Sequence, residues 1–466
     1  MDDLRRLDEI LDAARDGARD FLRTIAHRPA AVPREALRAF EFPALPDGGW
    51  GAERAIAFFR THLEPLLSGS AGPRYLGFVT GGAMPAGLAG DWLAAAYDQN
   101  VAIDGDSIAT RVERHTLSLL RTLFGLPDSF EGAFVSGATQ ANLVGLATAR
   151  QWAYERMGID VAEVGLSGAP PVAVLAGAPH ASIDKALSIL GMGRASIERV
   201  ACVADRPVMD PAALDARLAA RAKPGAPPCI VTASAGEVNT GDFDDLRAIA
   251  HVTQARGAWL HVDGAFGLFA AVDPERAHLL DGLAAADSIA SDGHKWLNVP
   301  YDSGFAFTRH LAVQERVFRA AAAYLGSGPD LLHRTPENSR RFRALPAWLA
   351  LMSYGREGYR ALVRRCCEHA GRLGAHIASS ESFELLAEVR LNIVCFALRS
   401  GDAQDRDRVL DDVQRGGRAF LTPTTYRGRP AIRAAFSNWS TTADDVGIVV
   451  RALEQAVRAS SARAVL

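Results

Sequence analysis

The chain has 466 residues, of which 48% are hydrophobic and 23% are charged. This composition is typical of a folded globular protein and excludes an intrinsically disordered chain. Lysine and arginine total 51 against 54 aspartates and glutamates, so the formal net charge is −3. This near balance argues against a nucleic-acid-binding protein or a polybasic membrane binder, because both need a positive excess. The length predicts two or three domains.

The cysteines and the N-terminus indicate the compartment. Five scattered cysteines are too few for a disulfide framework, and no CxxC pair indicates a zinc site. The first residues, MDDLRRLDEILDAARDG, mix charges throughout and lack the apolar core of a signal peptide. No apolar run approaches the length of a membrane span. These features predict a cytoplasmic protein with no metal and no membrane partner.

Residues 1–65 are expected to form a helical arm. Apolar residues recur at helical spacing from Leu4 to Phe21. A proline-rich stretch then interrupts the pattern, and a second helix is expected from Gly51 to Leu63. The arm is either a helical cap on the main domain or a segment that packs on a second subunit.

Residues 66–345 alternate short apolar runs with helical stretches. This alternation predicts a large α/β domain whose parallel or mixed sheet is covered by helices on both faces. Catalytic groups in such sheets gather in loops at the carboxyl ends of the strands. The expected strands are Gly132–Val135, Val172–Leu175, Ile230–Ala233, Trp259–Val262, Ser288–Ser291 and Gly304–Thr308, and the expected helices include Ala141–Arg156, Pro211–Arg221 and Leu246–Arg256.

Residues 346–466 predict a smaller α+β domain. Its expected helices and strands, in chain order, are the helices Ala347–Gly355 and Glu357–Ser379, the strand Asn392–Leu398, the helix Asp405–Gln414, the strand Pro430–Ala435 and a final helix from Ala443.

Three polar clusters each follow an expected strand of the large domain. PHASIDKA contains His180, HVDGAFG contains Asp263, and DGHKW contains Lys295. A lysine in a turn rimmed by aromatic and apolar residues suits Schiff-base chemistry, because desolvation lowers the pKa of its amine. Singly, the three could be a core histidine, a helix-capping aspartate and a surface lysine. Together and in this order, they form a specific pattern.

The pattern resembles the pyridoxal-phosphate-dependent decarboxylases that act on aromatic amino acids, histidine and glutamate. The aromatic branch combines a strand-end histidine with the stretches His-Val-Asp-Ala-Ala and Asn-Pro-His-Lys-Trp. Here these stretches read His180, His261-Val262-Asp263-Gly264-Ala265 and Asp292-Gly293-His294-Lys295-Trp296. The resemblance covers about Gly72 to Asp445. It implies a fold-type-I homodimer, with an aspartate-aminotransferase-like large domain, that uses pyridoxal 5′-phosphate on an amino acid as its small-molecule substrate.

The resemblance implies a role for each residue of the pattern. Lys295 would hold the cofactor as a Schiff base and be released by the substrate amine. Asp263 would pair with the pyridine nitrogen and keep it protonated, so that the ring withdraws electrons from the reacting carbon. His180 would stack on one face of the ring, and the small Ala265 would allow close approach on the other.

The phosphate of the cofactor needs N–H donors at a helix start. The segment Ser136–Asn142 offers a short turn followed by a helix, and it resembles the family's Gly-Ser-Ala-Ser-Glu-Ala. By this resemblance Ala138 and Thr139 bind the phosphate, with His294 as a further candidate. Asp292 stands where relatives carry asparagine, and an acid there would repel a phosphate unless it points away.

The substrate pocket is expected from two segments that resemble the family. Pro73–Gly81 would line the side-chain pocket, where Phe78 and Val79 make it apolar and Gly81 leaves room. Arg433 matches an arginine near the family's cofactor pocket, and it could instead be a solvated charge at a strand edge.

The chain departs from the family at two places. Val238 replaces a threonine that contacts the cofactor in relatives. In relatives, a tyrosine of a mobile loop protonates Cα, but the corresponding residues 324–341 are shorter here and have no tyrosine past Tyr324. His333 is the candidate proton donor of this lid. Alternatively, His333 is a solvated loop residue and the proton comes from Lys295, His180 or water.

The predicted function is decarboxylation of an L-amino acid, preferably with an aromatic or apolar side chain, to the amine and carbon dioxide. Two alternatives stay open. The first is an aldehyde synthase, which couples decarboxylation to oxidative deamination, or other Cα chemistry on the same cofactor. The second is a catalytically silent paralogue that binds pyridoxal phosphate.

Overall fold

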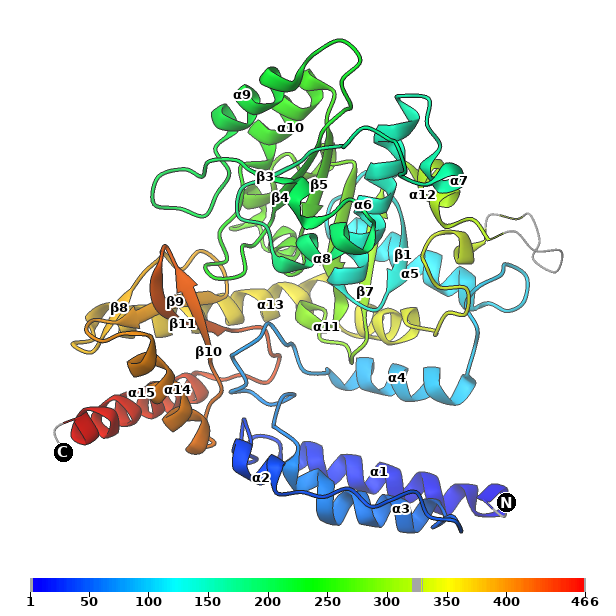
Figure 1. The fold of residues 1–466 in the computed structure, drawn as a ribbon. Helices are drawn as coiled ribbons and strands as arrows, with labels where there is room; N and C mark the ends of the chain where they lie inside the picture. Colours follow the sequence, from blue (N-terminus) through cyan, green and yellow to red (C-terminus); the bar gives the residue numbers. More distant parts are fainter. Residues whose placement is uncertain (1–2, 321–327, 329, 465–466) are drawn as a thin grey trace. The chain divides into compact units, whose positions relative to one another are not determined.

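The computed structural model describes residues 3–320, 328 and 330–464. The chain forms two compact units (Figure 1). The larger unit comprises Gly81–Ala370 and Ala387–Val394, and the smaller unit comprises Met1–Thr80, Gly371–Leu386 and Cys395–Leu466. The N-terminal arm and most of the C-terminal residues thus belong to the same unit, although they lie far apart in the sequence.

A seven-stranded sheet forms the centre of the larger unit, in the order β1-β7-β6-β5-β4-β2-β3. The neighbours from β3 to β6 pair in parallel, whereas β7 runs antiparallel to both β6 and β1. The predicted α/β fold with a mixed, mostly parallel sheet is confirmed. The strands are β1 (Glu131–Val135), β2 (Val174–Ala176), β3 (Ile197–Arg199), β4 (Ile230–Ser234), β5 (Trp259–Asp263), β6 (Ser288–Asp292) and β7 (Gly304–Thr308).

Helices connect these strands, and aspartate caps fix where two of them begin. The side chain of Asp210 accepts the N–H of Ala212, and that of Asp245 accepts the N–H of Ala248. Such caps satisfy backbone donors that have no partner within the helix. The α-helices are α4 (Pro85–Tyr97), α5 (Ala109–Leu123), α6 (Ala138–Glu155), α7 (Val161–Val164), α8 (Ala181–Ile189), α9 (Pro211–Arg221), α10 (Leu246–Arg256), α11 (Gly293–Trp296) and α12 (Leu311–Phe318).

Helix α6 is the element around which the candidate site is built. It contacts strands β4 to β7 and packs against α8 (Figure 1). Its residues Leu146 and Ala149 are buried in a core cluster that includes Trp259 of β5. A Cβ at Gly145 would lie 2.6 Å from Cε1 of His261, so this glycine allows the helix to approach β5 closely.

The smaller unit carries the arm and a second sheet, in the order β10-β11-β9-β8. The long helix α13 (Ala344–Ser379) belongs to the larger unit up to Ala370. It is broken at Gly355, whose φ of 58° is left-handed, and the sequence predicted two helices that meet there. The other elements are α1 (Leu7–Thr24), α2 (Arg34–Arg38), α3 (Ala52–Phe58), β8 (Phe383–Leu385), β9 (Ile393–Leu398), α14 (Ala403–Arg415), β10 (Thr422–Tyr426), β11 (Arg429–Ala435) and α15 (Ala443–Ala464).

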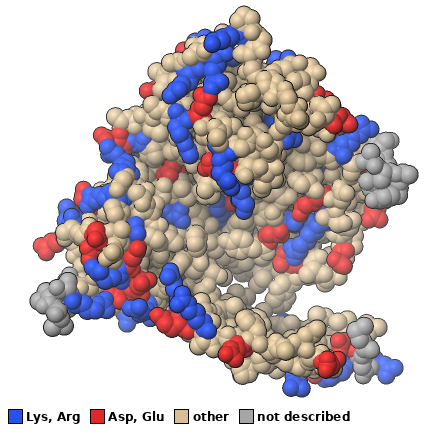
Figure 2. Space-filling model, in the orientation of Figure 1, with Lys and Arg blue, Asp and Glu red and all other residues tan. Residues whose placement is uncertain are grey.

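The surface carries charges of both signs. Figure 2 shows acidic and basic side chains interspersed on the visible face. Within the described part of the chain, every helix is too short or too polar to cross a membrane.

Candidate active site

Two neighbouring strands end in aspartates at the same edge of the large sheet. β5 ends at Asp263 and β6 ends at Asp292. The strands are parallel, with Asp263 paired to Ala290, so their carboxyl ends lie side by side. The short helix α11 follows β6 directly and carries Lys295. The topology thus brings the predicted aspartate and lysine to the strand ends where α/β folds place their sites.

Lys295 forms an ion pair with Asp292. Its Nζ lies 2.8 Å from Oδ2 of Asp292, and one-fifth of the lysine side chain is exposed, whereas the aspartate is buried. The ammonium also lies 5.8 Å from the centre of the Phe266 ring. The lysine is accessible, and its amine could attack a carbonyl group that enters the site once the ammonium has given up a proton.

The second oxygen of Asp292 lies at the N-terminus of α6. Oδ1 accepts a hydrogen bond from the N–H of Ala138, the first residue of α6, and lies 3.4 Å from Nε2 of His294. Helix N-termini favour anions, which is why the sequence predicted a phosphate at Ala138. The structure shows that the Asp292 carboxylate points toward this N–H rather than away from it.

Asp263 is held by two N–H groups. Its Oδ1 accepts from the backbone N–H of Ala265 at 3.1 Å, and its Oδ2 accepts from Nδ2 of Asn142 at 2.9 Å. A carboxylate offers about four lone-pair sites, so two hydrogen bonds leave capacity for a further positive donor. Asp263 is buried, with 8% of its surface exposed. This geometry fits the predicted pairing of Asp263 with a protonated ring nitrogen.

Asn142 connects Asp263 to a fully buried histidine. Oδ1 of Asn142 lies 2.9 Å from Nε2 of His261, and Nδ1 of His261 lies 2.8 Å from Oγ of Ser288. Burial lowers the pKa of His261 to about 4, so the imidazole is neutral at pH 7. Nε1 of Trp259 donates to Oγ of Ser288 at 3.0 Å and completes this side of the network.

His180 lies at the N-cap of α8 and is exposed. Its Nδ1 accepts the backbone N–H of Ser182 at 3.2 Å and lies 2.8 Å from the Ser182 hydroxyl. Nδ2 of Asn142 lies 3.0 Å from the same hydroxyl. One hydrogen-bonded network therefore joins the predicted His180 to the predicted Asp263.

Comparison with known proteins agrees with this geometry. The family model of the pyridoxal-dependent decarboxylase conserved domain matches residues 46–399. The chain belongs to this family. It is 26% identical to an aromatic-L-amino-acid decarboxylase of Bacillus atrophaeus, over 92% of this chain and 90% of the relative. Its fold matches the crystal structure of Oryza sativa TDC with PLP and tryptamine, with a TM-score of 0.87, 25% identity and 98% of each chain covered. It also matches mouse CSAD, with a TM-score of 0.88, 24% identity and 97% and 98% of the two chains covered.

The donor set of this decarboxylase fits pyridoxal phosphate. Lys295 supplies an accessible amine, and Asp263 supplies a carboxylate with unused acceptor capacity. The first turn of α6 supplies N–H donors for an anion, and the hydrogen bonds of the described residues use that of Ala138 but not those of Thr139 and Gln140. The acidic Asp292 at Ala138 is the one element of the set that opposes a phosphate.

The structure places three further predicted residues of the large unit. His294 is stacked on Tyr301, with ring centres 4.2 Å apart, and burial lowers the pKa of His294. Thr139 is exposed on the first turn of α6. Gly81 lies against α11, because a Cβ there would lie 1.9 Å from the carbonyl oxygen of Lys295. The absence of a side chain at Gly81 therefore makes room for the lysine backbone, whereas the sequence predicted room for a substrate.

The other predicted pocket residues belong to the smaller unit. The Phe78 side chain is half exposed and lies 5.9 Å from the Phe420 ring, which stacks on Tyr75. Val79 is buried. Arg433 is also buried, and its Nη2 donates to the carbonyl of Gly77 at 2.6 Å. Arg433 is therefore not the solvated charge that the sequence left open, and the pocket role of all three stays a prediction.

His333 is buried in the short 3-10 helix Leu331–His333. Its Nδ1 accepts the N–H of Ala320 at 3.2 Å. The alternative of a solvated loop residue is wrong, because the imidazole is only 9% exposed. The predicted lid, Gly326 to Pro329, lies outside the described residues except for Gly328, and the role of His333 as a proton donor stays a prediction.

No role was predicted from the sequence for His261, Asn142, Ser182 or Ser288. A signal for His261 was present, since alternate residues of a strand share a face and place Trp259, His261 and Asp263 together. Ser288 is the residue of β6 that pairs with His261. Asn142 carried no comparable signal, because its position depends on which face of α6 meets β5.

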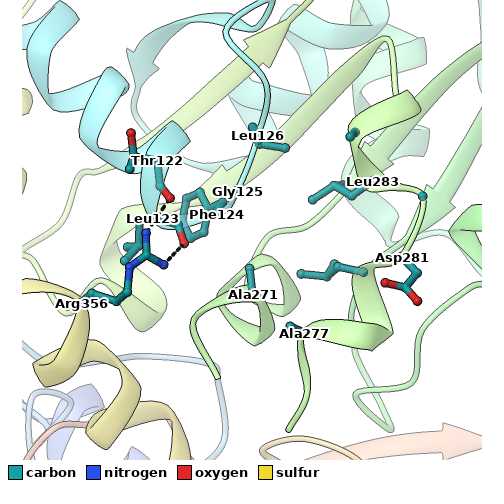
Figure 3. Close-up of a pocket in the computed structure, with 13 residues that line it drawn as sticks. Thr122, Leu123, Phe124, Gly125, Leu126, Ala271, Ala277, Asp281, Leu283 and Arg356 are labelled. Atoms are coloured by element: carbon teal, nitrogen blue, oxygen red, sulfur yellow. Dashed lines mark hydrogen bonds between the residues drawn. The ribbon is translucent and has the colours of Figure 1, made fainter. Parts of the chain in front are cut away.

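A separate cavity of about 400 Å³ lies at the C-terminal end of α5. Figure 3 shows Arg356 at its edge, where the guanidinium donates to the carbonyls of Thr122 and Leu123 at 2.7 and 2.9 Å. These bonds satisfy carbonyls of the last helical turn. None of the predicted site residues lines this cavity.

Proposed function

We propose that this decarboxylase acts on an L-amino acid with an aromatic or apolar side chain and releases the amine and carbon dioxide. Decarboxylation of an amino acid follows from the family, and the choice of side chain is the proposal. The observation that carries it is the aromatic cluster of Tyr75, Phe78 and Phe420, in which Phe78 remains half exposed. An aromatic surface in the predicted pocket segment favours an aromatic or apolar side chain over a charged one. The relative from Bacillus atrophaeus carries the name of an aromatic-L-amino-acid decarboxylase.

Each residue of the site would have a separate role. Lys295 would hold the cofactor through its amine. Asp263 would bind the ring nitrogen of the cofactor and keep that nitrogen protonated. When bound, pyridoxal phosphate supplies an electron sink for the electron pair that carbon dioxide leaves behind on Cα. His180, exposed at the start of α8, would face the ring. The N–H groups at the start of α6 would hold the phosphate.

The enzyme is further proposed to be a cytoplasmic homodimer. The N-terminal arm exposes several large apolar side chains, including Leu7 at 46%, Leu11 at 57% and Leu45 at 95%. Such a surface favours burial against a second copy of the chain. All five cysteines are free thiols, which suits a reducing compartment. Light scattering of the full chain and of a chain lacking residues 1–60 tests the dimer, and an active, monomeric truncated protein would refute it.

A product assay tests the activity. The purified protein, loaded with pyridoxal phosphate, is incubated with each standard amino acid while carbon dioxide, amine, ammonia and hydrogen peroxide are followed. We expect carbon dioxide and amine in equal amounts from aromatic or apolar substrates, and none from Lys295→Ala. Peroxide and ammonia together with carbon dioxide would instead identify an aldehyde synthase. No turnover of any amino acid by a cofactor-loaded protein would identify a silent paralogue.

His333 is tested by the same assay. If its imidazole delivers the proton to Cα, His333→Ala lowers the yield of amine relative to peroxide while substrate binding stays nearly unchanged. An unchanged ratio of products would remove His333 from the reaction.

A further inference from the structure

The side-chain amide of Asn142 has only one possible orientation. Asn142 is completely buried on α6, and its two polar atoms contact three partners. The Asp263 carboxylate can only accept, so the atom 2.9 Å from its Oδ2 must be the Nδ2 donor. Oδ1 of Asn142 is then an acceptor, and it faces Nε2 of His261.

This orientation fixes the tautomer of His261. An acceptor opposite Nε2 requires that Nε2 carry the proton. Nδ1 of the neutral imidazole must therefore accept the hydroxyl proton of Ser288 at 2.8 Å. The indole N–H of Trp259 donates to that hydroxyl oxygen at 3.0 Å. Each group from Trp259 through Ser288 and His261 to Asn142 therefore donates to the next one.

The second N–H of Asn142 reaches His180 through the Ser182 hydroxyl. It points to the Ser182 hydroxyl oxygen at 3.0 Å, which leaves the hydroxyl proton free to donate elsewhere. Nδ1 of His180 lies 2.8 Å from that hydroxyl and also accepts the Ser182 backbone N–H. Because Nδ1 accepts, the ring proton of neutral His180 lies on Nε2.

We propose that Asn142 is a positioning residue whose single amide sets both the orientation of the Asp263 carboxylate and the Nε2–H tautomer of His261, and that it reaches His180 only through the Ser182 hydroxyl. The inference rests on the proposed function, in which Asp263 pairs with the ring nitrogen of the cofactor and His180 faces its ring. The amide couples the group that sustains the electron sink to the group that faces the ring. Asn142 itself acts only through these two neighbours.

The packing of α6 supports this assignment. Gly145 lies one helical turn after Asn142, so the two share the face that meets β5. A Cβ at Gly145 would lie 2.6 Å from Cε1 and 2.7 Å from Nδ1 of His261. A glycine inside a helix costs up to about 1 kcal/mol relative to alanine. Here that glycine provides the space in which His261 reaches Asn142.

Histidine tautomers provide a test that does not depend on activity. Nitrogen-15 spectra of the protein with labelled histidine are recorded for the wild type, Asn142→Leu and Ser182→Ala. We expect the wild type to show His261 and His180 as Nε2–H. Asn142→Leu should lose the fixed tautomer at His261, whereas Ser182→Ala should leave His261 unchanged. His180 should stay Nε2–H in both variants, because the backbone N–H of Ser182 still faces its Nδ1. Thr148→Val is the matched control, because Thr148 is buried on α6 and its hydroxyl donates only to Val144 of the same helix.

Kinetics and a labelled cofactor complete the test. Loss of an outer-shell hydrogen-bond partner lowers activity about 10–100-fold in well-studied sites. We expect Asn142→Leu to lower kcat by that factor with KM within about twofold of the wild-type value. The nitrogen-15 shift of the labelled ring nitrogen should move toward the unprotonated form in Asn142→Leu and not in Thr148→Val.

The outcomes separate this inference from the proposed function. A wild-type His261 with its proton on Nδ1 would overturn the inference without any variant, as would wild-type tautomers and kcat in Asn142→Leu. If Asn142→Leu does not fold, the wild-type tautomer of His261 still decides. A wild type with the expected tautomers but no decarboxylation would contradict the proposed function and leave the network intact.

Discussion

The prediction that follows most directly from the packing of α6 is that Gly145→Ala destabilises the protein. An added Cβ would lie 2.6 Å from Cε1 of His261, about 0.8 Å inside the 3.4 Å of ordinary contact. His261 cannot turn away freely, because its two ring nitrogens are held at 2.8 and 2.9 Å by Ser288 and Asn142. The backbone or the network must therefore move.

The magnitude follows from two opposing effects. Extra methyl groups in a packed core cost about 1–3 kcal/mol. Replacing glycine by alanine inside a helix contributes about 0.5–1 kcal/mol in the other direction. The net expected loss is therefore about 0–2.5 kcal/mol of the free energy of unfolding. The 2.6 Å contact with a ring held on both sides favours the upper half of this range. Gly371→Ala is the matched control, because Gly371 lies within α13 and a Cβ there would meet nothing within 4 Å.

The assay compares thermal unfolding and kcat of the two variants with those of the wild type. We expect Gly371→Ala to raise the melting temperature slightly and to leave kcat unchanged. Gly145→Ala should lower both, since any displacement of His261 is passed through Asn142 to Asp263. A Gly145→Ala protein as stable and as active as Gly371→Ala would refute the reasoning about this contact.

Three further predictions concern Lys295, Asp292 and His261. Borohydride reduction of the cofactor-loaded protein should attach the pyridoxyl group to Lys295, and peptide mapping that found it on another lysine would contradict the assignment. Asp292→Asn should bind pyridoxal phosphate about tenfold more tightly in equilibrium dialysis. The substitution removes a negative charge next to the predicted phosphate site at the α6 N-terminus, at a gain of roughly 1–2 kcal/mol. An unchanged or weaker affinity would argue against repulsion between Asp292 and the phosphate. The pKa of His261 is about 4 when folded and 6.5 when unfolded, so the unfolded state binds more protons between these values. Stability from this group is complete above pH 6.5 and should fall by about 2 kcal/mol between pH 7 and pH 5 in urea titrations, whereas an ordinary titration of His261 near pH 6.5 would disprove it.

Much of the fold was predictable because local signals agree with the tertiary structure. α9 and α10 have the predicted bounds, since each begins at an aspartate cap and ends where its apolar period stops. β5 and β6 were predicted to within one residue, as the short runs Trp259–Val262 and Ser288–Ser291 between helical stretches. Asp263 and Lys295 were identifiable because each lies within four residues of the end of such a run.

The remaining elements carry too little pattern in the sequence. β3 and β8 have three residues each, which is less than two periods of a strand. β10 contains Pro423 and lies at the edge of its sheet, where the missing N–H is tolerated. The direction of Asp292 was equally hidden, because it depends on how the start of α6 approaches the end of β6.

The two strand-end carboxylates have different tasks because they have different partners. Asp292 is paired with the Lys295 ammonium and with the N–H of Ala138. Among the described residues, Asp263 receives two neutral N–H groups and forms no ion pair, so it retains acceptor capacity for a protonated ring nitrogen. If the cofactor phosphate binds at the start of α6, as predicted, Asp292 places a negative charge beside it. We therefore expect Asp292 to oppose cofactor binding and Asp263 to favour it, so that substitution of these two residues changes the affinity for the cofactor in opposite directions.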